Sequence, residues 1–397
     1  MVQRTILRPL RAFLATEAAG GILAVGAAIA AVVWANAAPH NYESWWSTEA
    51  AISVGHHVLR LDLKHWVNDA LMAIFFLVVG LEIKRELVQG ELRVPRRAAL
   101  PVAAALGGMV VPAALFAIIN TGQPTIRGWG VPMATDIALA LGVIALIGRR
   151  IVPASLSLFL LAVAIVDDIG AIVVIAVFYS NGIRFSWLAL GVAMVALTIA
   201  MRRLRVGAMG PYLVAGTVLW FALHEAGIHA TIAGVIMGLL APTTAVLSSG
   251  STSVVERLEH ALHPWSSFVI VPIFALSNAG IRLNSELFDG VLSAHVFWGI
   301  IVGLVIGKPV GITLASWLAV RTGVAELPNG VRMSQIAAIG AVAGIGFTVS
   351  LFVSDLAFGN AVDLGHDKFA VLVASISAGL IGATALRASS RRQATKG

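Results

Sequence analysis

The sequence contains no cysteine among its 397 residues, and only 12% of the residues are charged. The absence of cysteine excludes disulfides and metal sites built from thiolates. The share of charged residues is about half that of a soluble globular domain, whereas hydrophobic residues make up 58%. We therefore expect an all-α membrane protein that forms a single domain over residues 1–397.

Two stretches that look like cofactor motifs are incomplete. Gly303–Pro309 has neither the spacing nor the final Ser or Thr of a phosphate-binding loop. His224 and His229 are five residues apart, one more than in a zinc-binding helix, so they would point about 140° apart. We expect no cofactor and no ATP site. The formal charge of +7 does not indicate nucleic-acid binding, because its positive residues follow a membrane pattern.

Apolar runs predict twelve membrane-spanning helices, since one crossing needs about 20 apolar residues. Their approximate bounds are Ala12–Ala35, Trp66–Ile83, Ala98–Ile119, Trp129–Ile147, Ala154–Phe178, Trp187–Ala200, Met209–Leu223, Gly227–Leu240, Leu258–Leu276, Val296–Val320, Ser334–Val353 and Phe369–Leu386.

The positive residues support this count. With twelve spans, 20 of the 27 Lys and Arg residues lie on the side of both termini, six lie on the other side, and Lys308 lies inside a span. Positive loops mark the cytoplasmic side, so both termini are expected there. Ala12–Ala35 is longer than a signal-peptide core, and we interpret it as an uncleaved helix.

One segment on the opposite side has a strand pattern. Leu59–Lys64 alternates apolar and charged residues, and Gly55-His56, preceded by Ala51–Val54, predicts a two-residue turn. We expect a small β-hairpin over about residues 48–64. It either provides a dimer contact through its exposed edge or caps the outer mouth of the protein.

Two adjacent carboxylates, Asp167 and Asp168, lie within the otherwise uncharged run Ala154–Phe178. One charge at that depth costs at least ~2.5 kcal/mol, so such residues indicate a functional site. Neighbours on a helix point about 100° apart, so they cannot face one small site equally. Asp167 can pair with Lys308, the only cation deep within a span, while Asp168 faces an ion route.

Two spans are expected to be broken near their middle. The fourth contains Gly130–Asp136, with a proline and a Thr-Asp pair, and the eleventh contains Gly340–Gly346. Paired interruptions in the two halves of a membrane protein point to a binding site, although a Gly-rich stretch can also merely permit close helix packing. Broken helices expose partial charges of about ±0.5. Asp136 can neutralise N-terminal ends, and Lys308 C-terminal ends.

The oxygen atoms near these breaks suit a hard cation such as Na⁺ or Li⁺. Asp167, Asp168, Thr135 and the carbonyls of an unwound span would supply the ligands. We therefore predict that the metal-ion and proton site is centred on Asp167 and Asp168.

With these motifs, the chain resembles the bacterial NhaA-type sodium/proton antiporters from about Gly20 to Leu386. The matching motifs are Gly80–Leu87, Ala134–Ala138, Ala164–Gly170, Gly227–Gly234, Leu258–Trp265 and Gly307–Pro309.

The resemblance implies twelve helices, with an inverted repeat relating spans three to five and ten to twelve, and with broken spans four and eleven crossing. It implies a secondary transporter of the inner membrane, not an enzyme, that exports one Na⁺ or Li⁺ for two H⁺ and is activated at alkaline pH. It also implies a homodimer held partly by the hairpin, surrounded by membrane lipids.

The resemblance also assigns roles to individual residues. Asp167 and Asp168 would form the ion and proton site, with Thr135 and Asp136 supporting the broken span and Lys308 paired with Asp167. Four further residues would belong to pH sensing or to the cytoplasmic funnel: Glu82, Arg85, His229 and Glu259.

Structural alternatives stay open for several of these residues. Asp136 can serve only to balance helix ends, and Lys308 can be a scaffold or a proton carrier. His229 can be a packing residue, and Glu82 with its charged neighbours can form an ordinary solvated helix network.

Two other classes of membrane protein fit less well. An intramembrane aspartyl protease needs its two aspartates on different helices, whereas Asp167 and Asp168 are adjacent. A passive channel would favour repeated filter loops around a symmetric pore, whereas this chain has one asymmetric charged centre.

Overall fold

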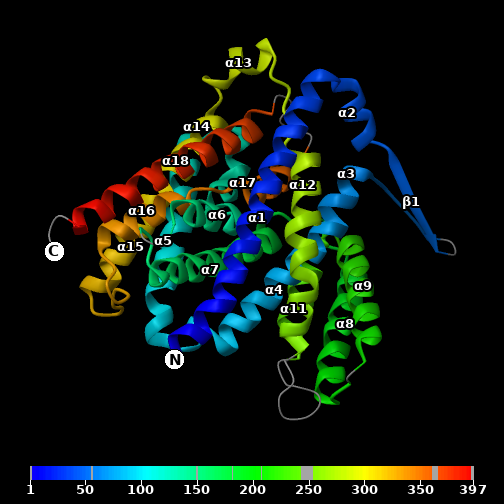
Figure 1. The fold of residues 1–397 in the computed structure, drawn as a ribbon. Helices are drawn as coiled ribbons and strands as arrows, with labels where there is room; N and C mark the ends of the chain where they lie inside the picture. The colour runs from blue at the N-terminus through cyan, green and yellow to red at the C-terminus, as the bar shows by residue number, and fades with distance from the viewer. Residues whose placement is uncertain are drawn as a thin grey trace.

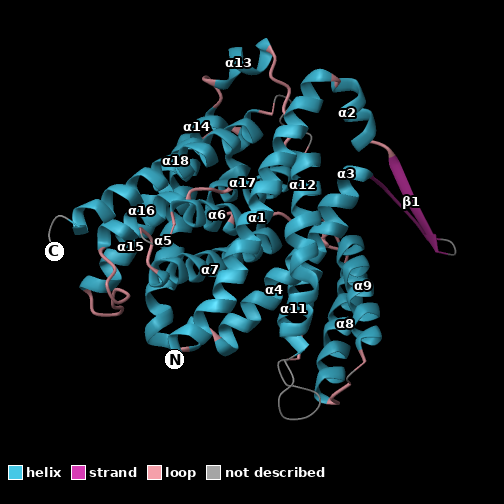
Figure 2. Ribbon diagram, viewed as in Figure 1, coloured by secondary structure: helices cyan, strands magenta, loops and turns pink. Residues whose placement is uncertain are grey.

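The computed structural model describes residues 2–54, 57–148, 151–180, 182–206, 208–242, 254–359 and 365–394. Within these residues the chain forms a bundle of helices with one two-stranded sheet (Figure 1). Figure 2 shows that the sheet projects away from the helical body. The N-terminus lies at the same end of the bundle as the last turns of α8 and α15, which carry Arg202, Arg203 and Arg321 (Figure 1). We call this end the basic end. The other end, with the sheet, is the hairpin end.

The helices and strands have the following bounds: α1 (Val2–Ala37), α2 (Pro39–Trp46), β1 (Glu49–Val54), β2 (His57–Asp62), α3 (Leu63–Trp66), η1 (Val67–Leu71), α4 (Met72–Gln89), η2 (Glu91–Arg93), α5 (Pro95–Ile119), η3 (Pro124–Met133), α6 (Ile137–Ile147), α7 (Ala154–Phe178), α8 (Phe185–Arg203), α9 (Met209–Ala226), α10 (Ile232–Leu240), α11 (Val254–Trp265), η4 (Ser266–Ile270), α12 (Val271–Asn278), α13 (Ser285–Val291), α14 (His295–Val302), η5 (Gly303–Gly307), α15 (Lys308–Arg321), α16 (Met333–Ala343), α17 (Phe347–Phe358) and α18 (His366–Ala394).

Seven helices of the described chain are long and apolar enough to cross a membrane, or up to nine if each of two bent pairs is one span. Large apolar side chains such as Ile118, Leu213 and Leu380 are exposed on the outside of the bundle. A helix satisfies its own backbone hydrogen bonds and can therefore face lipid along its length. The chain is a multi-pass membrane protein.

The predicted span Gly227–Leu240 is shorter in the structure. Gly227 adopts a left-handed conformation with φ 79° and ends α9, and the next helix begins only at Ile232. A glycine at this position relieves the steric cost of positive φ, which is why helices commonly end there. By contrast, α7 spans Ala154–Phe178, the same bounds as the predicted span.

The hairpin is present, but its second strand ends earlier than predicted. β1 pairs antiparallel with β2 in a register that joins Ala51 to Arg60. The alternating pattern predicted a strand to Lys64, whereas Asp62 accepts a hydrogen bond from the His65 N–H and caps α3. An aspartate at an N-cap favours helix over strand at this point. The predicted turn at Gly55-His56 lies outside the described residues.

The two predicted interruptions are present as bends. η3 and α6 meet at 44° across Ala134–Asp136, and α16 and α17 meet at 51° across Gly344–Gly346. Each break leaves backbone groups without helical partners in the interior of the bundle. The site is built around these two breaks.

Close backbone contact fixes α5 against α15. A Cβ atom on Gly107 would collide with the Gly311 carbonyl oxygen, and one on Gly311 would collide with that of Gly107. Small residues at membrane helix interfaces allow this approach. Because α15 begins at Lys308, this contact positions the buried lysine.

Candidate functional site

The two broken spans are joined through their unwound segments. The Asp136 N–H donates to the Ile345 carbonyl at 2.6 Å. The Thr135 hydroxyl donates to the Ala343 carbonyl at 2.9 Å, and the Ser350 hydroxyl donates to the Val131 carbonyl at 2.8 Å. Polar groups freed by one break are thus satisfied by the other, as buried backbone groups require.

Asp136 lies at the start of two helices. Its Oδ1 accepts the Leu139 N–H at 3.0 Å, which caps α6, and its Oδ2 accepts the Thr348 N–H at 3.0 Å and the Thr348 hydroxyl at 2.6 Å near the start of α17. A carboxylate between two helix N-termini is stabilised by both partial positive charges. This geometry holds the two breaks together.

Lys308 is completely buried and pairs with Asp167. Its Nζ lies 2.6 Å from Asp167 Oδ2, and it also donates to the carbonyl of Met133, the last residue of η3. Thr135 lies beside the same carboxylate. The lysine therefore compensates both a carboxylate and the C-terminal end of a half-helix.

Asp168 has different surroundings, although it is the next residue. It is buried, yet within the described residues it makes no hydrogen bond and no ion pair. It lines a cavity of about 50 Å³ together with Thr135 and Asp136. A buried carboxylate without partners is costly unless a ligand, a water molecule or a proton satisfies it.

The same cavity reaches a group of acidic residues and a histidine toward the basic end. Glu82 of α4, Glu17 of α1 and His263 of α11 line it. His263 Nε2 lies 2.6 Å from Glu17 and 3.8 Å from Glu82. Next to them, Arg85 forms an ion pair with Glu259. The structure thus brings together Glu82, Arg85 and Glu259.

Sequence reasoning missed Glu17 and His263 as members of this group. Glu17 is a charged residue inside the predicted span Ala12–Ala35, and this was the available signal. His263 lies inside the matching motif Leu258–Trp265, but only the fold shows that it faces α1 and α4.

His229 lies apart from this group. Its Nε2 is 2.7 Å from the Tyr179 carbonyl, just after the end of α7. It interacts with Asp69, near the beginning of the helical segment Leu63–Gln89, whereas Glu82 and Arg85 lie near that segment's end. At 1.5 Å per residue the two positions are roughly 20 Å apart.

Within the described part of the chain, no group of three or more histidines and acidic residues is arranged to hold a metal ion. A cation at Asp167 and Asp168 would therefore need further ligands from hydroxyls, carbonyls or water. Such mixed oxygen ligands suit a hard ion that has to be released again.

Comparison with known proteins agrees with this architecture. The family model described as Na⁺/H⁺ antiporter 1 matches residues 11–386. A Na⁺/H⁺ antiporter NhaA of Escherichia coli is 46% identical, with 96% of this chain and 98% of the relative covered. One from Oleidesulfovibrio alaskensis and NhaA 2 of Clostridium beijerinckii are each 44% identical, with 96% of this chain and 94% of each relative covered. The chain belongs to the Na⁺/H⁺ antiporter 1 family, whose named members are transporters rather than enzymes.

Proposed function

We propose that the protein is a secondary transporter that exports Na⁺ or Li⁺ in exchange for protons through Asp168 and Asp167. The observation that carries this proposal is the environment of Asp168, a buried carboxylate that faces a small cavity and has no partner in the described chain. The names of the relatives, all Na⁺/H⁺ antiporters, support Na⁺ and protons as the exchanged ions.

Exchange follows from competition for the same oxygen atoms. A proton or a cation can satisfy Asp168, but both cannot occupy the carboxylate together. When a cation arrives through the cavity, the Asp168 proton leaves, and Asp167, Thr135 and nearby carbonyls complete the ligands. On the other side of the membrane, protonation of Asp168 releases the cation.

A second proton belongs to the pair of Asp167 and Lys308. As Asp167 turns to the cation, its ion pair with Lys308 loosens and the pair gives up one proton. Two protons then move against one cation, so each cycle transfers net charge. The membrane potential would drive such an electrogenic cycle.

The surroundings of the site suggest regulation by pH. Glu17, Glu82 and His263 contribute titratable groups to the cavity, and Arg85 and Glu259 lie beside them. We propose that this cluster adjusts cation entry. His229 would act separately, by holding the end of α7.

The finer architecture is part of the same proposal. The protein would form a single transporter domain of twelve spans with an inverted repeat, and access to the site would alternate around the two breaks. It would lie in the inner membrane with both termini in the cytoplasm, which fits the positive residues of the basic end. A homodimer would form through the exposed edge of the hairpin, within membrane lipids. No cofactor, ATP or nucleic acid is required.

Ion exchange in proteoliposomes tests this function. The purified protein is reconstituted with an internal pH dye, and Na⁺, Li⁺ or K⁺ is added to one side. We expect Na⁺ and Li⁺, but not K⁺, to move protons, and Asp168→Asn to abolish the response. Asp289→Asn, at an exposed position of α13, is the matched control that retains it. Full exchange by Asp168→Asn would disprove the assigned site, and no response of the wild type at any pH would disprove antiport.

A further inference from the structure

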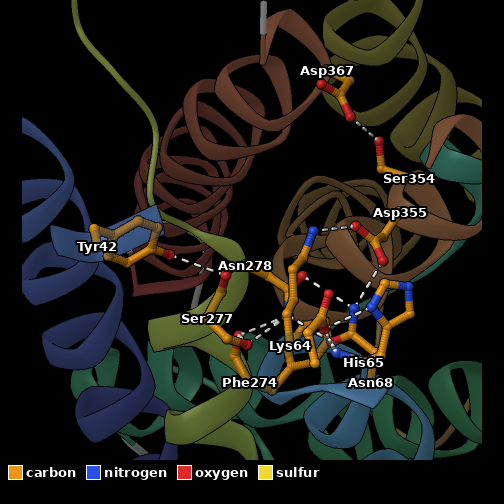
Figure 3. A network of polar contacts seen from close by, with 11 residues as sticks. Tyr42, Lys64, His65, Asn68, Phe274, Ser277, Asn278, Ser354, Asp355 and Asp367 are labelled. Carbon is orange, nitrogen blue, oxygen red and sulfur yellow. Dashed lines mark hydrogen bonds and ion pairs between the residues drawn. The ribbon is translucent and has the colours of Figure 1, made fainter. Parts of the chain in front are cut away.

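A largely buried polar network lies just after the hairpin, and Figure 3 shows its side chains and their contacts. Lys64 Nζ lies 2.8 Å from Asp355 Oδ1, and the Asn68 amide donates to Asp355 Oδ2 at 2.8 Å. The Asn278 amide donates to Asn68 at 2.8 Å and to the Ser277 hydroxyl at 2.8 Å. The network connects the segment after the hairpin with α12 and α17.

Each of three residues in this network is seven positions from a residue that lines the Asp168 cavity. Asn68 precedes Phe75, Asn278 follows Val271, and Asp355 follows Thr348, and all three of these partners line the cavity. Seven residues are about two helical turns, or roughly 10 Å, and return to nearly the same face of a helix. The network therefore lies on the hairpin side of the cavity, along the same three helical segments.

Three phenylalanines pack together along these segments, and two of them, Phe274 and Phe352, lie between the cavity-lining residue and the network residue of their helix. Phe76, Phe274 and Phe352 come from the same three segments and are almost fully buried. The ring of Phe352 lies 5.4 Å from that of Phe76 and 6.1 Å from that of Phe274, measured between centroids. An apolar layer of this kind blocks hydrated ions.

We infer that Lys64, Asn68, Asn278 and Asp355 form an outer gate, which closes the ion path toward the hairpin end and must separate when the site opens there. This inference rests on alternating access, which is part of the proposed function. Asp355 lies on α17, the half-helix that carries Thr348 and its bonds to Asp136. Movement of α17 at the site would pull Asp355 away from Lys64.

The charged residues of this network are typical of a contact that opens and reforms, rather than of a permanent ion-binding site. Lys64 and Lys368 stand near Asp355 and Asp367, so positive and negative groups balance, and the Ser354 hydroxyl donates to Asp367 at 2.6 Å. Lys64 and Asp355 retain 25% and 20% side-chain exposure. A partly exposed pair is worth less than a fully buried one, and it can open and reform.

Cysteine accessibility tests the gate, because the chain has no cysteine of its own. Val349→Cys places a thiol on the cavity, and Ser53→Cys on exposed β1 identifies the hairpin side of sealed vesicles. A membrane-impermeant maleimide is added from that side. In the Val349→Cys background, Lys64→Gln/Asp355→Asn is expected to raise the labelling rate about tenfold, because a minor open state becomes more populated.

Two matched variants distinguish opening of the gate from a general loss of packing in the protein. Lys64→Arg keeps the charge and should keep the slow labelling rate. Arg184→Gln/Glu225→Gln removes another ion pair, 2.8 Å long, beside His224 and its partner Asp69, and should also leave the rate unchanged. If the double gate variant does not fold, Lys64→Gln alone gives the same comparison.

An unchanged labelling rate in Lys64→Gln/Asp355→Asn would overturn the inference. An equal increase in the Arg184→Gln/Glu225→Gln control would overturn it too. The labelling does not depend on Na⁺/H⁺ exchange. Failure of the gate and failure of the proposed antiport are therefore seen in different measurements.

Discussion

Asp136 accepts two hydrogen bonds from Thr348, at 3.0 Å from its N–H and at 2.6 Å from its hydroxyl, while also capping α6. One carboxylate thus holds the first turns of two half-helices, although Asp136 and Thr348 are 212 residues apart in sequence. Thr348 is the only residue of α17 that reaches Asp136 with both backbone and side chain in the described structure.

The first prediction concerns this shared cap. Asp136→Ala should lower the free energy of unfolding by about 2–4 kcal/mol, since each lost N-cap costs about 1–2 kcal/mol. Asp136→Asn keeps an acceptor oxygen and should lose less. Thermal unfolding in detergent measures both, with Thr348→Ser as the control that preserves the hydroxyl. An unfolding midpoint equal to that of the wild type in Asp136→Ala would contradict this role.

The two adjacent aspartates should respond differently to the same substitution. Asp168→Asn should leave thermal stability nearly unchanged, because Asp168 has no hydrogen bond to lose within the described residues. Asp167→Asn leaves the Lys308 charge buried without its partner, which typically costs about 3–5 kcal/mol. Unfolding of both variants in the same detergent is the measurement. Equal destabilisation would show that the two carboxylates are not distinguished as the structure indicates.

A third prediction follows from pairing Lys308 with Asp167. The double variant Lys308→Met/Asp167→Asn removes both charges, so it should be more stable than either single variant. Breaking one partner leaves an uncompensated charge, whereas replacing both does not. A double-mutant cycle on unfolding free energies measures the coupling. Additive losses would mean that the 2.6 Å contact contributes nothing.

The fourth prediction concerns the response to pH. Protonated His263 attracts both Glu17 and Glu82, and this attraction disappears when rising pH removes the proton. His263→Gln lacks the attraction at every pH and so resembles the deprotonated, alkaline state of the wild type. We therefore expect it to exchange ions at a lower pH than the wild type. A shift of about one pH unit would correspond to ~1.4 kcal/mol.

The rate of Na⁺-driven proton movement between acid and alkaline pH measures this shift. Neighbouring Arg85 and Glu259 stay in place, and His40→Gln, at an exposed position of α2, is the control. A pH profile of His263→Gln that overlays the wild type would remove His263 from regulation.

Local patterns in the sequence, such as apolar runs and Gly or Pro positions, predict much of this fold. The largely apolar run Ala154–Phe178, charged only at Asp167 and Asp168, has the bounds of α7, and the Gly and Pro positions predict where two spans bend. The alternating stretch predicts the hairpin. These features depend on residues that are close in sequence, and so they can be read without tertiary structure.

Features that depend on distant residues could not be predicted in the same way. The alternating pattern predicts a strand that includes Lys64, whereas Lys64 lies in α3 and contacts Asp355, 291 residues away. The short helices α2 and α13 have no long apolar run to mark them. Glu17 joins His263 only because α1 lies against η4 and α12.

The contact between Gly107 and Gly311 has a consequence for how motion in this protein should be described. Because the two backbones touch, sliding or rotation of α15 over α5 would meet steric resistance within a fraction of an ångström. Lys308 stands three residues before Gly311 and shares this constraint. α5 and α15 together are therefore the natural frame of reference for superposing different conformations, with Lys308 as a fixed charge within that frame.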